Sequence, residues 1–151
     1  MDGFETRLLK GVCSALADQI QSAPVPTLYY EDDTQPYPDD GQTIIARGIY
    51  PQRAGGSVTV NVYPVDDTPL GDDILGIQIA IWHPDIDSLN DLASWVFDTL
   101  HDLWGATLGD VKVVSGSRSS GANLGQDSNG RQGRTENYYL TVLRPSPNQS
   151  A

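Results

Sequence analysis

The clearest pattern of apolar and polar positions lies between Ile74 and Leu103, where it predicts a strand followed by a helix. From Ile74 to Trp82, branched apolar residues alternate with small or polar ones; the apolar set is Leu75, Ile77, Ile79 and Ile81. A repeat of two residues places this set on one face of a β-sheet. We therefore expect a strand with one continuous buried face.

A short turn at 83–86 leads from this strand into a predicted helix from Asp87 to Trp104. Asp85 or Asp87 suits the N-cap, and Gly105 suits the position after the last turn. One apolar stripe runs along the helix and would face the sheet. Its members are Leu89, Leu92, Ala93, Val96, Leu100 and Leu103.

Three aromatic residues widen the apolar surface of this helix. Phe97 and Trp104 lie on one flank of the stripe and Trp95 lies on the other. The apolar arc is then about 200° wide, against the roughly 100° that contact with one sheet requires. Either another part of the chain covers the flanks, or part of the arc, with Trp95 and Trp104, contacts another protein chain.

A second helix is predicted near the start of the chain, over residues 4–20, where apolar residues share one face. Gly11 lowers the stability of this helix by up to about 1 kcal/mol relative to alanine. Tertiary contacts must therefore hold it in place. Pro24 and Pro26 close it, because proline restricts the residue before it to extended conformations.

The remaining patterns predict short strands separated by polar loops. The expected strands cover 27–30, 43–50, 57–63, 110–115 and 136–144, with an acidic loop at 31–42 and a polar tail at 145–151. A ten-residue acidic loop at 64–73 would join two antiparallel strands. Together these elements predict one α+β domain over residues 1–151, with a mainly antiparallel β-sheet, two helices packed on one face and long polar loops.

Residues 115–135 are almost wholly Ser, Gly, Asn, Gln, Asp and Arg and show no periodicity. A segment of this composition predicts a long flexible loop, either functional or disordered. Arg118, Arg131 and Arg134 form a local basic cluster within it. They either keep the loop soluble or contact acidic surfaces of neighbouring copies, and we take them as candidate assembly contacts.

The net charge of −11 at pH 7 is distributed unevenly along the chain. Residues 1–110 hold 18 acidic and 4 basic residues, whereas residues 111–151 hold 2 acidic and 5 basic ones. This acidity argues against binding of nucleic acid over most of the surface. No apolar run approaches the roughly 18 residues of a membrane span, and the first residues lack the pattern of a signal peptide, so we expect a soluble protein.

Paired aspartates are the first candidates for chemistry, because Mg²⁺ and Ca²⁺ prefer oxygen ligands. The pairs are Asp32-Asp33, Asp39-Asp40, Asp66-Asp67 and Asp72-Asp73. None has the alternating spacing of an EF-hand loop, and neighbouring side chains point apart in an extended chain. We expect solvated loop carboxylates, with Asp66, Asp67, Asp72 and Asp73 as further candidate assembly contacts.

The other reactive side chains form no catalytic pattern. His83, Asp85 and His101 lack a serine in a G-x-S-x-G turn, which a Ser–His–Asp site on an α/β-hydrolase would need. Cys13 is the one cysteine and lies in a predicted helix, where it reads as a small buried hydrophobe. The sequence thus predicts no catalytic residue, no cofactor and no metal site.

Three segments carry a resemblance to a known family. The strand at 76–82 leads into a helix of the form L-x-x-L-A-x-x-V-x-x-x-L, and this order is similar to the tail terminator or minor capsid proteins of tailed bacteriophages. The late segments 127–131 and 137–145 resemble the final strand of those proteins. The opening helix followed by residues 25–30 is consistent with them too.

The resemblance implies a structural virion protein of the phage neck, assembled in the host cytoplasm. It would form a homo-oligomeric ring, typically of six copies, at the head-proximal end of the tail tube. Its partners would be the tail tube protein and the head–tail connector or adaptor proteins. DNA would pass through the lumen without specific binding, and acidic side chains facing the lumen would keep it from adhering.

Other classes remain open on the sequence alone. One is a neighbouring head–tail adaptor or stopper, which would bind connectors and not cap tail tubes. Another is an enzyme that uses the paired aspartates with Mg²⁺, which metal uptake would reveal. A third is a host-directed binding module, which would act as a monomer.

Overall fold

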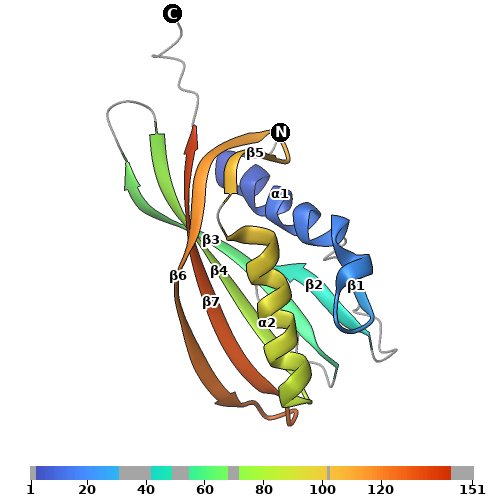
Figure 1. The fold of residues 1–151 in the computed structure, drawn as a ribbon. Coiled ribbons are helices and arrows are strands. Elements are labelled where there is room, and N and C mark those ends of the chain that lie inside the picture. The colour runs from blue at the N-terminus through green and yellow to red at the C-terminus, as the bar shows by residue number, and fades with distance from the viewer. Residues whose placement is uncertain (1–2, 31–41, 49–54, 68–71, 102, 144–151) are drawn as a thin grey trace, which may run out of the picture.

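The computed structural model describes residues 3–30, 42–48, 55–67, 72–101 and 103–143. Two helices and seven strands form most of this part of the chain (Figure 1). In chain order they are α1 Phe4–Asp18, the 3₁₀ turn η1 Ile20–Ser22, β1 Thr27–Tyr29, β2 Thr43–Arg47, β3 Ser57–Asp67, β4 Asp72–His83, α2 Ile86–Leu100, β5 Leu103–Leu108, β6 Val111–Gln126 and β7 Gln132–Leu143. The predicted loop at 31–42 and the tail at 145–151 lie almost wholly outside the described residues.

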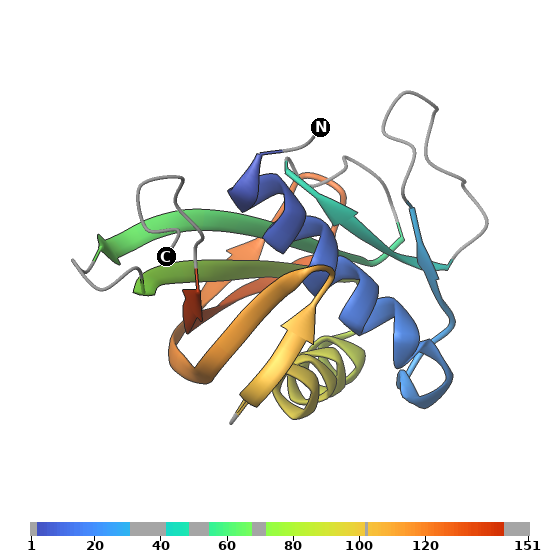
Figure 2. The same ribbon diagram turned by 90° about the horizontal axis from the view of Figure 1, so that it is seen from above.

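The seven strands form one curled sheet in the order β1-β2-β3-β4-β7-β6-β5. Pairing is parallel for β1–β2 and β2–β3 and antiparallel for every other neighbour. Both helices lie on the hollow side of the sheet, and Figure 2 shows α1 crossing it, where it contacts β3 and β5. The predicted α+β class with two helices on one face is confirmed, and the sheet is mixed at one edge.

The core lies where the sequence pattern places it, between β4 and the helices. Each of the four alternating apolar residues of β4 is at most 2% exposed; they are Leu75, Ile77, Ile79 and Ile81. They belong to one buried cluster with the stripe of α2 and with the apolar face of α1. Asp85 caps α2 by accepting a hydrogen bond from the backbone N–H of Ser88, at 3.0 Å, as expected of an N-cap residue.

The predicted end of the second helix is wrong. Helix α2 stops at Leu100, and His101 already has extended backbone angles. Trp104 lies in β5, opposite Ser115 of β6, and Gly105 occupies a left-handed position (φ 59°) within that strand. Apolar residues at 103 and 104 fit the helical stripe equally well, so backbone pairing with β6 across the turn at 109–110 decides their conformation.

The predicted flexible loop at 115–135 is also wrong. Strands β6 and β7 form a long hairpin through this segment, paired from Val113–Val142 to Gln126–Gln132 and interrupted by three bulges. Most side chains of β6 beyond Gly116 are exposed, so the strand carries no alternating apolar pattern that a sequence would reveal. The two ends of the predicted acidic loop at 64–73 belong to strands, because Asp66 pairs with Ile74 and Asp67 with Asp73 in the antiparallel β3–β4 hairpin, and residues 68–71 lie outside the described residues.

Candidate functional site

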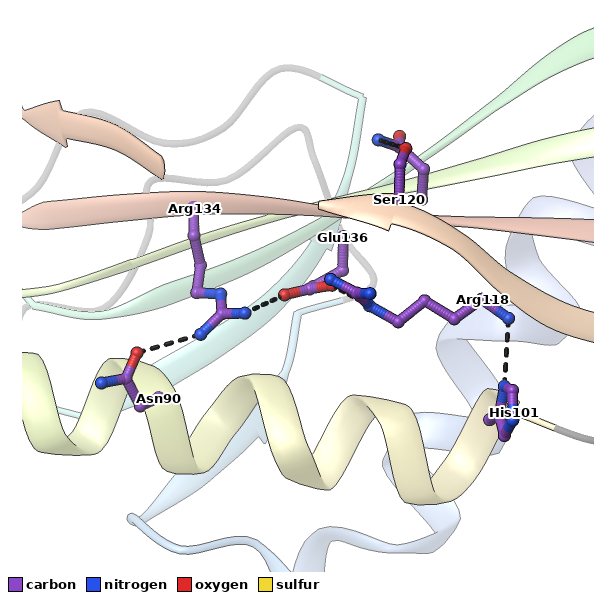
Figure 3. Close-up of polar contacts among 7 residues, drawn as sticks. Asn90, His101, Arg118, Ser120, Arg134 and Glu136 are labelled. Carbon is purple, nitrogen blue, oxygen red and sulfur yellow. Dashed lines mark hydrogen bonds and ion pairs between the residues drawn. The ribbon is translucent and has the colours of Figure 1, made fainter. Parts of the chain in front are cut away.

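A buried carboxylate between two arginines is the main polar cluster on the helix side of the sheet (Figure 3). Glu136 of β7 is 2% exposed and accepts a hydrogen bond from Arg118 Nε of β6 at 2.6 Å. Arg134, two residues earlier on β7, donates to the other carboxylate oxygen. Strand alternation places Arg134 and Glu136 on the same face, so this contact follows directly from their spacing.

Both arginines also connect the β6–β7 hairpin to α2. Arg134 donates to Asn90 Oδ1 at 2.9 Å, and the backbone N–H of Arg118 donates to His101 Nδ1 at 3.1 Å. Between the helix and the hairpin lies a hollow of about 330 Å³, bordered on the helix side by Phe97 and Asp98. Hydrogen bonding to Glu136 raises the pKa of Arg118, which therefore stays charged. Glu136 balances one of the two guanidinium charges, so the cluster keeps a net charge of +1 while it fixes the hairpin to α2.

Arg131 has a separate and fully buried position. Its side chain is 0% exposed and forms an ion pair with Asp127 at 2.9 Å. It also donates to the carbonyl oxygen of Gly55 at 3.0 Å and to Ser57 Oγ at 3.2 Å, and it lies over the ring of Trp82. The three arginines of the predicted basic loop are thus not a free surface cluster, because each is bound within the chain and Arg131 is inside it.

The pKa of Asp127 gives a prediction on acid stability. Burial alone would raise this pKa, but hydrogen bonds from the backbone and side chain of Arg131 lower it below the ordinary 3.8. The stabilisation is therefore complete above that value and is lost as pH falls through the lower folded pKa. Urea unfolding between pH 5 and pH 2 is expected to show a steeper loss of stability for the wild type than for Asp127→Asn; equal slopes would contradict this.

The two candidate tryptophans have opposite environments. Trp95 is 6% exposed, and its indole N–H donates to the carbonyl oxygen of Gln19 at 3.1 Å and to Ser22 Oγ at 3.3 Å. The end of α1 and the turn η1 therefore cover this flank of α2. This agrees with the first of the two alternatives, in which another part of the chain covers the flanks. Trp104 is 78% exposed on β5. Trp104 is therefore by far the more accessible of the two.

The remaining candidates show no catalytic arrangement. His83 Nδ1 accepts a hydrogen bond from the backbone N–H of Asp85, within the turn before α2, and burial lowers the pKa of His83. Cys13 is buried, and that burial raises the pKa of its thiol to about 12. The described residues contain no group of three or more His, Cys, Asp or Glu side chains that could hold a metal ion.

The paired aspartates and the membrane expectation are only partly covered by the structure. Asp32, Asp33, Asp39 and Asp40 lie outside the described residues, and only the backbone of Asp66, Asp67, Asp72 and Asp73 is described, in β3 and β4. No helix in the described ranges has both the length and the apolar character of a membrane span.

Comparison of the sequence with protein-family models gives no match, and comparison with curated proteins gives none either. Among solved structures, one similar chain comes from the virion of a native gene transfer agent particle. The identity is 14% and the TM-score is 0.47, with 66% of this chain and 78% of that chain covered. Similarity at this level identifies neither a family nor a function.

Proposed function

We propose that this chain is a non-enzymatic structural protein of a phage-like virion, and more narrowly a tail terminator that forms a ring at the head-proximal end of the tail tube. The observation that carries the proposal is an exposed apolar surface on an acidic protein. Trp104 is the most exposed of the large apolar side chains in the described residues, with Val114 and Leu143 also about two-fifths exposed at 39% and 42%. Exposed apolar groups of this size mark a surface that another protein covers.

The class of assembly comes from the sequence resemblance. The resembling strand and helix correspond to β4 and α2 at the centre of the fold, and the resembling final strand corresponds to β7. Arg118 and Arg134, partly exposed beside α2, and the four aspartates at the end of the β3–β4 hairpin remain proposed assembly contacts. The alternative within the same class is a head–tail adaptor or stopper.

The proposal is tested by the mass of the purified protein in solution, measured by light scattering with and without purified tail tubes. We expect a closed ring, either alone or on the tubes, and tubes that stop growing once it is bound. A protein that binds purified connectors and ignores tubes would support the adaptor instead. A monomer that binds neither would contradict both assignments.

A further inference from the structure

A groove of about 590 Å³ lies on the helix side of the sheet, bordered by α1, α2 and β5. Apolar side chains contribute to its lining, namely Ala15, Trp95, Leu103 and Leu108. The indole N–H of Trp95 is already bound by Gln19 and Ser22, so the ring is held in place. The groove therefore offers a preformed apolar surface that needs little ordering when a partner binds.

The charged side chains that line this groove are all acidic. They are Asp18 at the end of α1 and Asp91 and Asp98 on α2, and all three are exposed. Within the described ranges, no lysine or arginine lines the groove, and no ion pair or hydrogen bond engages these three carboxylates. An apolar lining with unpaired carboxylates is complementary to an apolar surface that carries a positive charge.

A surface of that kind lies on the opposite face of the same sheet. The exposed Val114 and Leu143 line a depression of about 450 Å³ there, together with Lys112 and no acidic residue, and the exposed Trp104 directly precedes Gly105, which also lines it. Leu103 lines the groove and Trp104 follows it in β5, and successive side chains of a strand point to opposite faces. The groove and this patch therefore lie back to back and cannot meet within one molecule.

We propose that the acidic groove of one copy receives the patch around Trp104 and Lys112 of a second copy. Two different, complementary surfaces are what a head-to-tail interface requires, and such an interface repeats from copy to copy and forms a ring where the rotation between copies closes. The contact would cover the indole of Trp104 and bring Lys112 to Asp91 and Asp98. This inference rests on the proposed ring and names the surfaces that build it.

The test uses one variant blocked on each surface. Asp91→Lys with Asp98→Lys alters the groove, and Trp104→Ser alters the patch; each is expected to stay monomeric at concentrations where the wild type forms rings. Each variant keeps one intact surface, so an equimolar mixture is expected to form a complex of one copy of each and nothing larger. A face-to-face interface between identical surfaces would not give this result.

Matched controls distinguish the loss of the interface from a change in net charge and from a failure to fold. Glu5→Lys with Asp87→Lys changes the net charge equally at exposed positions outside the groove and is expected to form rings like the wild type. Urea midpoints of the variants show whether they fold. Two results would overturn the inference and leave the proposed function standing. In the first, the wild type and both blocked variants all form rings. In the second, the wild type forms rings but the mixture of the two variants stays monomeric. Wild-type protein that never assembles would overturn both.

Discussion

Replacing Arg131 with methionine is expected to lower the free energy of unfolding by about 3–5 kcal/mol, the usual cost of removing one partner of a buried ion pair. The side chains of Arg131 and Asp127 are 0% and 5% exposed, so water screens this pair far less than a surface pair. Without the guanidinium, the carboxylate of Asp127 stays buried and keeps only backbone N–H donors. Urea unfolding followed by circular dichroism measures the loss.

The cost is large because one guanidinium joins two segments that are far apart in the chain. It binds Asp127 in the turn between β6 and β7, the carbonyl oxygen of Gly55 and the hydroxyl of Ser57 at the start of β3. Lysine keeps the charge but lacks the planar fork, so Arg131→Lys is expected to fall between the wild type and the methionine variant.

An exposed ion pair provides the control. Arg7 donates to Asp110 at 2.8 Å, but the two side chains are 36% and 64% exposed. Arg7→Met is expected to cost at most about 1 kcal/mol, because water and salt screen such a pair. Equal losses for Arg7→Met and Arg131→Met would show that Arg131 contributes no more than a surface charge.

This contrast also marks the limit of what the sequence reveals about the basic segment. Composition predicts that Arg118, Arg131 and Arg134 could be replaced together with little effect on monomer stability, since they lie among Ser and Gly. The structure reverses that expectation, because each guanidinium binds a carboxylate of the same hairpin, Asp127 or Glu136. The alternation of Arg134 and Glu136 was the one signal available, and it is visible only once the segment is read as a strand.

The core, by contrast, follows from the sequence. Alternation in β4 and the helical stripe in α2 are local, repeated patterns, and burial of each large apolar side chain contributes roughly 1.5–3 kcal/mol. That driving force makes the pattern and the structure agree from Leu75 to Ile81 and from Leu89 to Leu100. Strand β5 and most of β6 lack it, because their conformation depends on backbone pairing within the β5–β6 and β6–β7 hairpins and not on a repeated apolar pattern.

The sequence does not predict the acidic groove, for a related reason. Asp91 and Asp98 lie two turns apart on α2, so a helical wheel places them near each other on its polar face. Asp18 joins them only because α1 crosses the sheet beside α2 (Figure 1). A sequence pattern within one helix gives no information on that crossing.

Replacing Gly11 with alanine is expected to lower the stability of the protein, although helix propensity alone predicts that alanine stabilises α1. Alanine in the middle of α1 would gain up to about 1 kcal/mol on the helix scale. A Cβ atom at this position, however, would lie 2.4 Å from the carbonyl carbon of Leu108 and 2.7 Å from the amide nitrogen of Gly109. These are backbone atoms of the turn between β5 and β6, so they cannot rotate away as a side chain would.

Gly11→Ala is therefore expected to destabilise the protein by about 1–3 kcal/mol, the usual range for an overpacked contact. Ser14→Ala is the matched control, because Ser14 is exposed on the same helix and gains propensity without a clash, with an expected gain of at most about 0.7 kcal/mol. Urea midpoints of the two variants should move in opposite directions from the wild type. If both rise, the turn at 108–109 yields to α1, and the close approach of the helix to the sheet edge does not require glycine.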